Sequence, residues 1–173
     1  YLSFDYFGTR FAEQMVVDYE HGLNAIDFYA LGGKRSFSNN YQIDFNVEAF
    51  RRFTVSATFR YTDAKVELEG RGLVERPMTS RYKGVLNLQY ATNLNKWIFD
   101  FTASVNGKAR VYEFMKDLRG DDGKLLYADG YTPAYPLLYL QVTKRFKGVD
   151  LYLGAENLTN FRQKNVVIGT SVD

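Results

Sequence analysis

Residues 52–62 read RFTVSATFRYT, an unbroken alternation of polar and apolar side chains. The odd positions from Phe53 to Tyr61 are apolar, and the even positions between them are threonine, serine or arginine. Successive side chains of a β-strand point to opposite faces, so this stretch predicts a strand with one apolar and one polar face. A helix would spread the same apolar side chains around its whole circumference.

The same alternation recurs along the rest of the chain and predicts an all-β protein. Aromatic residues, which favour strands, make up 17% of the sequence, and it contains three prolines. Long strands that follow one another directly are typical of an antiparallel up-and-down meander. Strands are expected near residues 1–20, 26–49, 52–68, 81–91, 97–114, 136–146 and 149–160.

Three positions interrupt the alternation. At Gly8 the apolar phase slips, and a β-bulge there would restore the facing within one strand. Residues 31–34 break the next segment; we interpret them as a bend within one long strand, with a separate short hairpin as the alternative. Asn106–Gly107 is typical of a hairpin turn, but a bulge at this point would leave one long strand from 97 to 114.

Short and long connections alternate along the chain. Residues 49–52, 92–96 and 147–148 form short turns, whereas 69–80 and 115–135 are long, polar and glycine-rich. A barrel in a bacterial outer membrane has this asymmetry, with tight turns at the periplasmic end and long loops outside. The short link at residues 20–25 is an exception to the scheme.

Alternation alone fits both a soluble barrel with an apolar interior and a membrane barrel with an apolar exterior. Two features favour lipid contact: the polar faces are rich in threonine, serine, asparagine and glutamine, and aromatic residues such as Tyr82, Tyr90 and Trp97 bracket the apolar faces. An apolar set is expected on the convex, lipid-facing side: Phe53, Val55, Phe59, Leu86, Leu88, Phe99, Phe101, Leu140 and Leu151. A polar set is expected on the concave, lumen-facing side: Asp44, Glu48, Thr58, Arg60, Gln89, Asp100, Thr102, Gln141 and Arg145.

Composition and motifs argue against several other functions. The 22 basic and 20 acidic side chains give a net charge of +2, which offers no electrostatic basis for binding nucleic acid. Without cysteine there is no thiolate metal site or thiol nucleophile, and the single histidine, His21, lies in a link as an exposed loop residue. The aspartates at 117, 121, 122 and 129 miss the spacing of a calcium loop. We therefore expect no enzyme activity, no metal and no cofactor.

The C-terminal stretch LYLGAENLTN, residues 151–160, resembles the "GxENLxN" segment of TonB-dependent outer-membrane receptors, especially those of Bacteroidetes. Residues 6–11, YFGTRF, together with Gln14, Val16, Val17 and Asp18, are similar to the "YFRTDFxNQVVVD" strand of the same group. Residues 36–39 and 97–100 also match it. The resemblance therefore extends over essentially the whole chain.

The resemblance implies a transporter with a barrel of the 22-stranded type, an N-terminal plug inside it and a TonB box. Such receptors take up siderophores, haem, cobalamin, metals or glycans across the outer membrane of Gram-negative bacteria. Residues 1–173 would be a C-terminal portion of the barrel, with about seven long strands and without the plug. The implied partners are outer-membrane lipid, the plug and remaining strands of the parent receptor, and TonB through the absent N-terminal part. No ligand-binding residue is transferred by the resemblance.

Two other readings remain open. The chain could be a complete eight-stranded outer-membrane protein with a structural or adhesive role, or a soluble ligand-binding barrel. Bacterial single-chain barrels have even strand numbers, so a seven-stranded portion is expected to leave its first and last strands unpaired. Residues 164–170 resemble the start of a further loop or returning segment.

Overall fold

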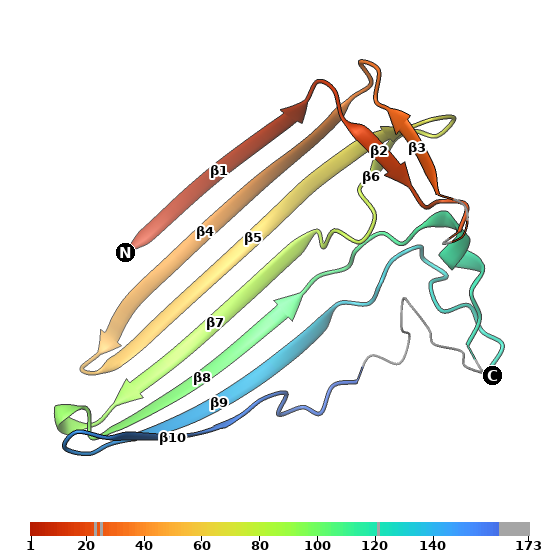
Figure 1. The fold of residues 1–173 in the computed structure, drawn as a ribbon. Coiled ribbons are helices and arrows are strands. Elements are labelled where there is room, and N and C mark those ends of the chain that lie inside the picture. Colours follow the sequence, from red (N-terminus) through yellow and green to blue (C-terminus); the bar gives the residue numbers. More distant parts are fainter. Residues whose placement is uncertain (23, 25, 121, 163–173) are drawn as a thin grey trace.

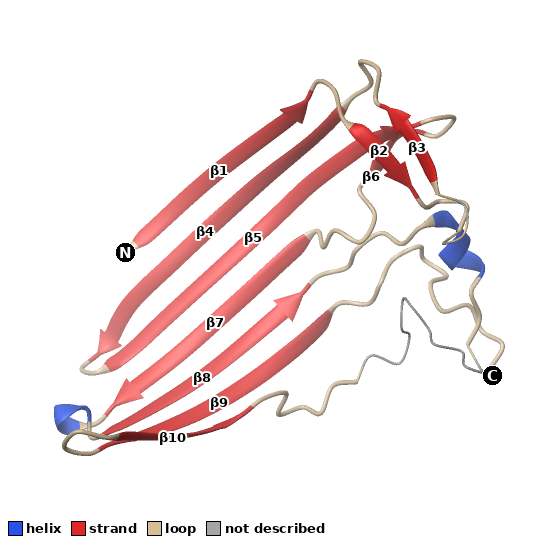
Figure 2. Cartoon of the chain, viewed as in Figure 1, coloured by secondary structure: helices blue, strands red, loops and turns tan. Residues whose placement is uncertain are grey.

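The computed structural model describes residues 1–22, 24, 26–120 and 122–162, and it consists mainly of one curved antiparallel sheet (Figures 1 and 2). Setting aside three short strands, each strand pairs with the next one along the chain, which confirms the all-β meander. The sheet order is β1 (Leu2–Phe11), β4 (Ser36–Phe50), β5 (Phe53–Leu68), β7 (Tyr82–Ala91), β8 (Trp97–Asn106), β9 (Tyr135–Arg145) and β10 (Asp150–Ala155).

The short strands lie at one end of the sheet. β6 (Gly72–Glu75) pairs with the end of β5, and β2 (Met15–Asp18) pairs with β3 (Asp27–Ala30) in a separate two-stranded sheet. Two 3-10 turns complete the described elements, η1 (Asn93–Asn95) and η2 (Glu113–Asp117). No helix among the described residues is long and apolar enough to cross a membrane.

Seven strands form the main path of the sheet, as expected from the sequence. Within the part of the chain that the structure describes, β1 and β10 are its two edges and do not pair with each other. The segment expected to continue at residues 164–170 lies outside the described residues. The backbone groups along the free sides of β1 and β10 therefore have no partner strand among the described residues.

The expected strand at 1–20 is wrong, because it is two strands in different sheets. β1 keeps a regular register through Gly8, which pairs with Asn39, so there is no bulge at this glycine. The glycine instead makes room for a side chain: a Cβ at position 8 would lie 2.5 Å from the hydroxyl oxygen of Tyr6. Phe7 and Phe11 lie on the polar face of the same strand, where they pair with Asn40 and Ser36, so the apolar phase changes within β1 without a shift of register. The chain leaves the main sheet only after Phe11.

The expected continuous strand at 26–49 is also wrong, and the alternative of a separate hairpin is confirmed. β3 pairs with β2, and β4 begins only at Ser36. Gly32 and Gly33 adopt φ angles of 57° and 78°, a left-handed conformation that an extended strand does not accommodate. β2 and β3 therefore form a hairpin within one long connection between β1 and β4.

The strand expected at 97–114 ends at Asn106, and the predicted bulge is wrong. Gly107 donates its backbone N–H to the carbonyl oxygen of Tyr82 at 2.8 Å, and a Cβ at position 107 would lie 2.7 Å from that oxygen. After this close approach the chain leaves the sheet and makes isolated bridges, such as that between Arg110 and Tyr131. β10 is also shorter than expected, since it ends at Ala155.

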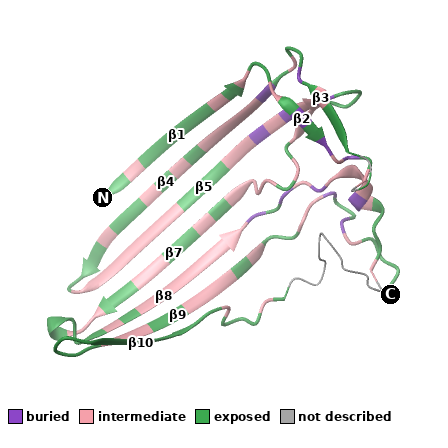
Figure 3. Ribbon diagram, in the orientation of Figure 1, coloured by how far each residue is buried: buried purple, intermediate pink, exposed green. Residues whose placement is uncertain are grey.

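Buried residues gather at the loop end of the sheet, while the middle of the sheet is half-buried or exposed (Figure 3). One cluster consists of Val16, Leu31, Val66 and Leu68, and the other of Val111, Met115 and Tyr127. The first cluster joins the β2–β3 hairpin region to the end of β5. The chain thus buries little of its long strands against itself.

Candidate functional site

The pairing of the strands separates the apolar and polar sets completely. Val55 pairs with Leu88, Leu88 with Phe101 and Phe101 with Leu140, so one row of the apolar set crosses four strands. The registers place every other member of the apolar set on that same face and every member of the polar set on the opposite face. That the apolar face contacts lipid and the polar face lines a lumen stays a prediction.

The polar face is a network of hydrogen bonds between neighbouring strands. Thr58 Oγ1 donates to Asp44 Oδ1 at 2.6 Å, and Gln89 Nε2 donates to Asp100 Oδ1 at 2.7 Å. Further pairs of this kind are Arg60 with Gln42, Thr62 with Asn40, Asn46 with Ser56 and Asn87 with Thr102. These side chains satisfy one another across the strands, which suits a wall that faces water.

The apolar face is bordered by aromatic rows at both ends. Tyr6, Tyr41, Tyr61 and Tyr82 form one row of directly paired residues, in which the rings of Tyr6 and Tyr41 are 5.1 Å apart. Near the short turns, a second row contains Phe53, Tyr90, Phe99 and, beside them, Trp97. Along β5, the span from Phe53 to Tyr61 is close to the about 9–11 residues with which a tilted strand crosses a bilayer.

The connection between β1 and β4 covers the polar face at one end of the sheet, whereas large apolar side chains of the opposite face, such as Phe59 and Leu140, are exposed. Val66 and Leu68 lie on the same face of β5 as Arg60, which is the polar face. They are buried under Val16 and Leu31 from the long connection between β1 and β4. Ser36, paired with Val66 on that face, donates a hydrogen bond to Gln14 of the same connection. The hairpin therefore folds over the polar side of the sheet, at the end away from the short turns (Figure 1).

A buried carboxylate joins three loops. The Glu20 side chain is 1% exposed, and its Oε1 accepts hydrogen bonds of 2.7 Å from both Nη1 and Nη2 of Arg110. Its Oε2 accepts a hydrogen bond of 2.6 Å from the backbone N–H of Glu113 and lies 3.5 Å from Arg71. Sequence reasoning missed this cluster, because its members are far apart in the chain and follow no motif.

A second polar cluster secures the loop of β6. Arg81 Nε donates to Glu75 Oε2 at 3.1 Å, and Arg81 Nη2 donates to the hydroxyl of Tyr131 at 2.6 Å. The Tyr131 hydroxyl in turn donates to Glu75 at 3.1 Å. The hydrogen bond with Glu75 raises the pKa of Arg81 above its ordinary value.

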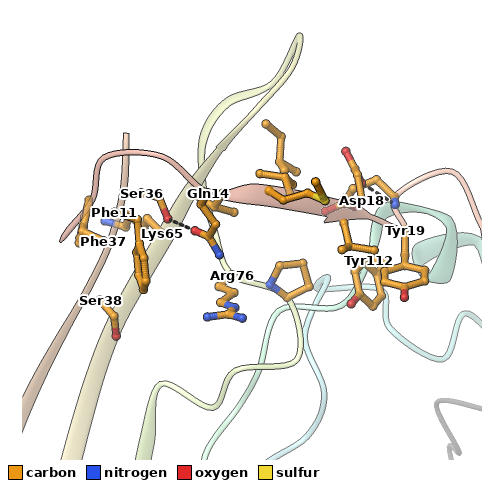
Figure 4. Close-up of a pocket in the computed structure, with 17 residues that line it drawn as sticks. Phe11, Gln14, Asp18, Tyr19, Ser36, Phe37, Ser38, Lys65, Arg76 and Tyr112 are labelled. Atoms are coloured by element: carbon orange, nitrogen blue, oxygen red, sulfur yellow. Dashed lines mark hydrogen bonds between the residues drawn. The ribbon is translucent and has the colours of Figure 1, made fainter. Parts of the chain in front are cut away.

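A pocket of 250 Å³ lies between the hairpin and the sheet (Figure 4). Its lining includes Gln14, Asp18, Tyr19, Arg76 and Tyr112. Burial is the main cause that raises the pKa of Tyr112, so its hydroxyl is a neutral donor at physiological pH. Within the described ranges, the guanidinium of Arg76 makes no hydrogen bond or ion pair and is free to meet an anionic group.

The described members of the histidine and aspartate set considered in the sequence have other surroundings than a metal site. His21 is exposed at the tip of the β2–β3 hairpin. Asp129 pairs with Lys108 at 3.0 Å and Asp122 with Lys124 at 3.5 Å, whereas Asp121 lies outside the described residues. Across the described segments, no three histidine, aspartate or glutamate side chains are placed to hold a metal ion together.

Comparison with known proteins shows a likeness of fold. No protein-family profile matches the chain, and no curated protein sequence matches it either. The structure is similar to that of BauA, the ferric preacinetobactin receptor from Acinetobacter baumannii, with a TM-score of 0.56 and 12% sequence identity. The match covers 92% of this chain and 23% of BauA, so this chain spans about a quarter of that receptor's length. At this identity the comparison establishes that the chain folds like a segment of the receptor.

Proposed function

We propose that the chain forms part of the barrel wall of a TonB-dependent receptor in a Gram-negative outer membrane. The observation that carries the proposal is the asymmetry of the sheet: the connection between β1 and β4 covers the polar face, and the opposite face exposes large apolar side chains bordered by aromatic rows. In a soluble barrel with the apolar set inside, this connection would lie on the outer surface of the barrel. The fold shared with BauA and the GAENLTN segment at 154–160 support the same reading, and the segment favours the Bacteroidetes type.

In this proposal the role of the chain is structural. The apolar face matches the lipid, and the hydrogen-bonded polar face lines the lumen and meets a plug domain. The free edges of β1 and β10 pair with further strands of the receptor, because unpaired backbone groups in hydrocarbon cost several kcal/mol each. The chain supplies no catalytic group, and energy for transport reaches the receptor through TonB.

The loop end supplies the ligand contact. The lining of the pocket beneath the hairpin combines the guanidinium of Arg76, the hydroxyl of Tyr112 and the amide of Gln14 with the carboxylates of Asp18 and Glu20. The guanidinium and the hydroxyl suit anionic oxygens of a ligand, and the carboxylates suit its hydrogen-bond donors. The nutrient belongs to one of the classes that the family imports: a siderophore, haem, cobalamin, a metal complex or a glycan.

The membrane placement is tested by fluorescence quenching. The chain has no cysteine, so Leu88→Cys and its neighbour Asn87→Cys can be labelled with bimane in the full-length protein, provided that any native cysteines elsewhere in it are replaced first. In vesicles that contain brominated lipid, the label at 88 should be quenched strongly and the label at 87 weakly. Equal quenching at both positions, or stronger quenching at 87, would contradict the proposal.

The transport function needs a separate measurement. Cells that carry the gene should accumulate a labelled nutrient of one of the named classes. Uptake should stop when TonB is deleted or when a protonophore dissipates the proton gradient. Accumulation that is independent of TonB would point to a passive pore or to the alternative of a small structural barrel.

A further inference from the structure

The short turns at one end of the sheet carry a strong excess of positive charge. The turns between β4 and β5, β7 and β8, and β9 and β10 lie at the same end of the molecule (Figure 1). They contain Arg51, Arg52, Lys96 and Lys147 and no acidic residue. Among the described residues, none of these side chains forms an ion pair, whereas some cations at the loop end, among them Arg110 and Arg81, are paired with carboxylates.

Apolar side chains project from the same turns. Leu94 is 83% exposed and Phe50 is 60% exposed, and Phe146 and Val149 at the third turn are also largely exposed. Large apolar side chains next to free cations are poorly placed in bulk water. They match the boundary between headgroups and acyl chains, where apolar groups insert and cations remain at the surface.

Lys144 extends this surface onto the apolar face. It pairs with Trp97 on one side and with Leu151 on the other, so it shares their face of the sheet. Its Nζ lies 4.0 Å from the centre of the Trp97 ring and 5.6 Å from that of Phe146. The nearby carboxylate of Asp150 is paired with Arg145 on the opposite face and does not neutralise Lys144.

We propose that Arg51, Lys96, Lys144 and Lys147, with the rings of Trp97 and Phe146, form a binding surface for the phosphate groups of anionic phospholipids. The inference rests on the proposed membrane placement, and the lipids concerned are those of the leaflet next to the short turns. Charge complementarity selects an anionic headgroup, and the exposed apolar tips select a lipid over a free phosphate ion or a nucleic acid. Each cation near a membrane surface strengthens binding of an anionic partner about fivefold.

The test measures lipid binding to the delipidated full-length protein in detergent. Phosphatidylglycerol and phosphatidylcholine are titrated separately, and inorganic phosphate is titrated as a third probe. The test variant is R51Q/K96Q/K144Q/K147Q, and the matched control K34Q/K108Q/R119Q/K124Q removes as many cations from the loop end. Because a variant could fail to fold, thermal unfolding in phosphatidylcholine alone is compared first, and the charge-preserving K96R/K144R/K147R provides a second check.

The unaltered protein, the control and the arginine variant should bind phosphatidylglycerol more tightly than phosphatidylcholine. The test variant should lose this preference by about fivefold for each cation removed. Equal binding of both lipids by the unaltered protein, or phosphate binding as tight as that of phosphatidylglycerol, would overturn the inference. If bimane at position 88 is quenched by lipid while this preference is absent, the inference fails and the proposed function stands.

Discussion

Arg110 donates two hydrogen bonds of 2.7 Å to one oxygen of the Glu20 carboxylate, although the two residues are 90 positions apart in the chain. Both side chains are buried or nearly so, with 1% of Glu20 and 11% of Arg110 exposed. The pair joins the connection after β1 to the loop after β8, over the polar face of the sheet.

Removing the carboxylate with Glu20→Ala should loosen this loop cluster. The substitution leaves the Arg110 guanidinium buried without its main partner, and breaking a buried pair in this way costs roughly 3–5 kcal/mol. Limited proteolysis should then cleave residues 107–134 faster. Lys124→Gln is the control, because Lys124 is 84% exposed in its ion pair with Asp122 and such pairs contribute about 0–1 kcal/mol. Equal cleavage of both variants would show that the Glu20 pair does not hold the loops.

Gly107→Ala should destabilise the end of β8. The added Cβ would lie 2.7 Å from the carbonyl oxygen of Tyr82, so the backbone must shift, and such overpacking costs roughly 1–3 kcal/mol. Gly154→Ala serves as the control, because its Cβ would meet the nearest atom, the carbonyl oxygen of Leu140, at an ordinary 3.6 Å. Urea unfolding of both variants measures the difference, and an unchanged midpoint for Gly107→Ala would contradict the close approach.

Acid should weaken the loop cluster slightly. The hydrogen bond from Lys116 lowers the pKa of Glu113 below its ordinary value of 4.5, and the hydrogen bond from Lys108 lowers that of Asp129 below 3.8. A carboxyl whose pKa is lower in the folded state stabilises that state above its unfolded pKa, and the contribution is lost as the pH falls through the folded pKa. Protection of residues 107–134 from hydrogen exchange, corrected for intrinsic rates, should therefore fall below pH 4.5.

Two substitutions separate these pairs from a general effect of acid. In K108Q/K116Q the carboxyls lose the partners that lower their pKa values, so protection should be weaker at neutral pH and should change less between neutral and acidic pH. If acid lowers the protection of this variant as much as that of the unaltered protein, other titratable groups cause the loss of protection. The two carboxyls are largely exposed, so solvent screening keeps the effect small.

The strands and their two faces could be predicted from the sequence because alternation is a local signal. Val55 and Leu88 each belong to the apolar positions of their own alternating segment, which predicts that both lie on the apolar face. The structure pairs them directly. The number of long strands was predicted for the same reason. Because side chains alternate along a strand, its apolar residues share one face whichever strands lie beside it.

The loop site could not be predicted, because its contacts depend on residues that are distant in sequence. Nothing around Glu20 indicates that Arg110 will meet it, since their spacing follows from how two long loops fold. The error at Gly107 has the same origin, because Tyr82 belongs to another strand. The error at Gly8 is different, because Tyr6 lies only two residues before it in the same strand. Gly8 reads as a bulge until the ring of Tyr6 is seen above it, and Gly107 reads as a bulge until the carbonyl of Tyr82 is seen beside it.

Leu88→Arg should destabilise the protein in a membrane by roughly 2–4 kcal/mol, because Leu88 lies in the middle rows of the apolar face, between the two aromatic rows. The neighbouring substitution Asn87→Arg adds the same charge to the polar face, where Thr102 and water can solvate it, and should cost much less. Reversible urea unfolding in lipid vesicles compares the two variants with the unaltered protein. If Leu88→Arg leaves the free energy of unfolding unchanged while Asn87→Arg lowers it, the apolar face does not meet hydrocarbon and the sheet is oriented the other way.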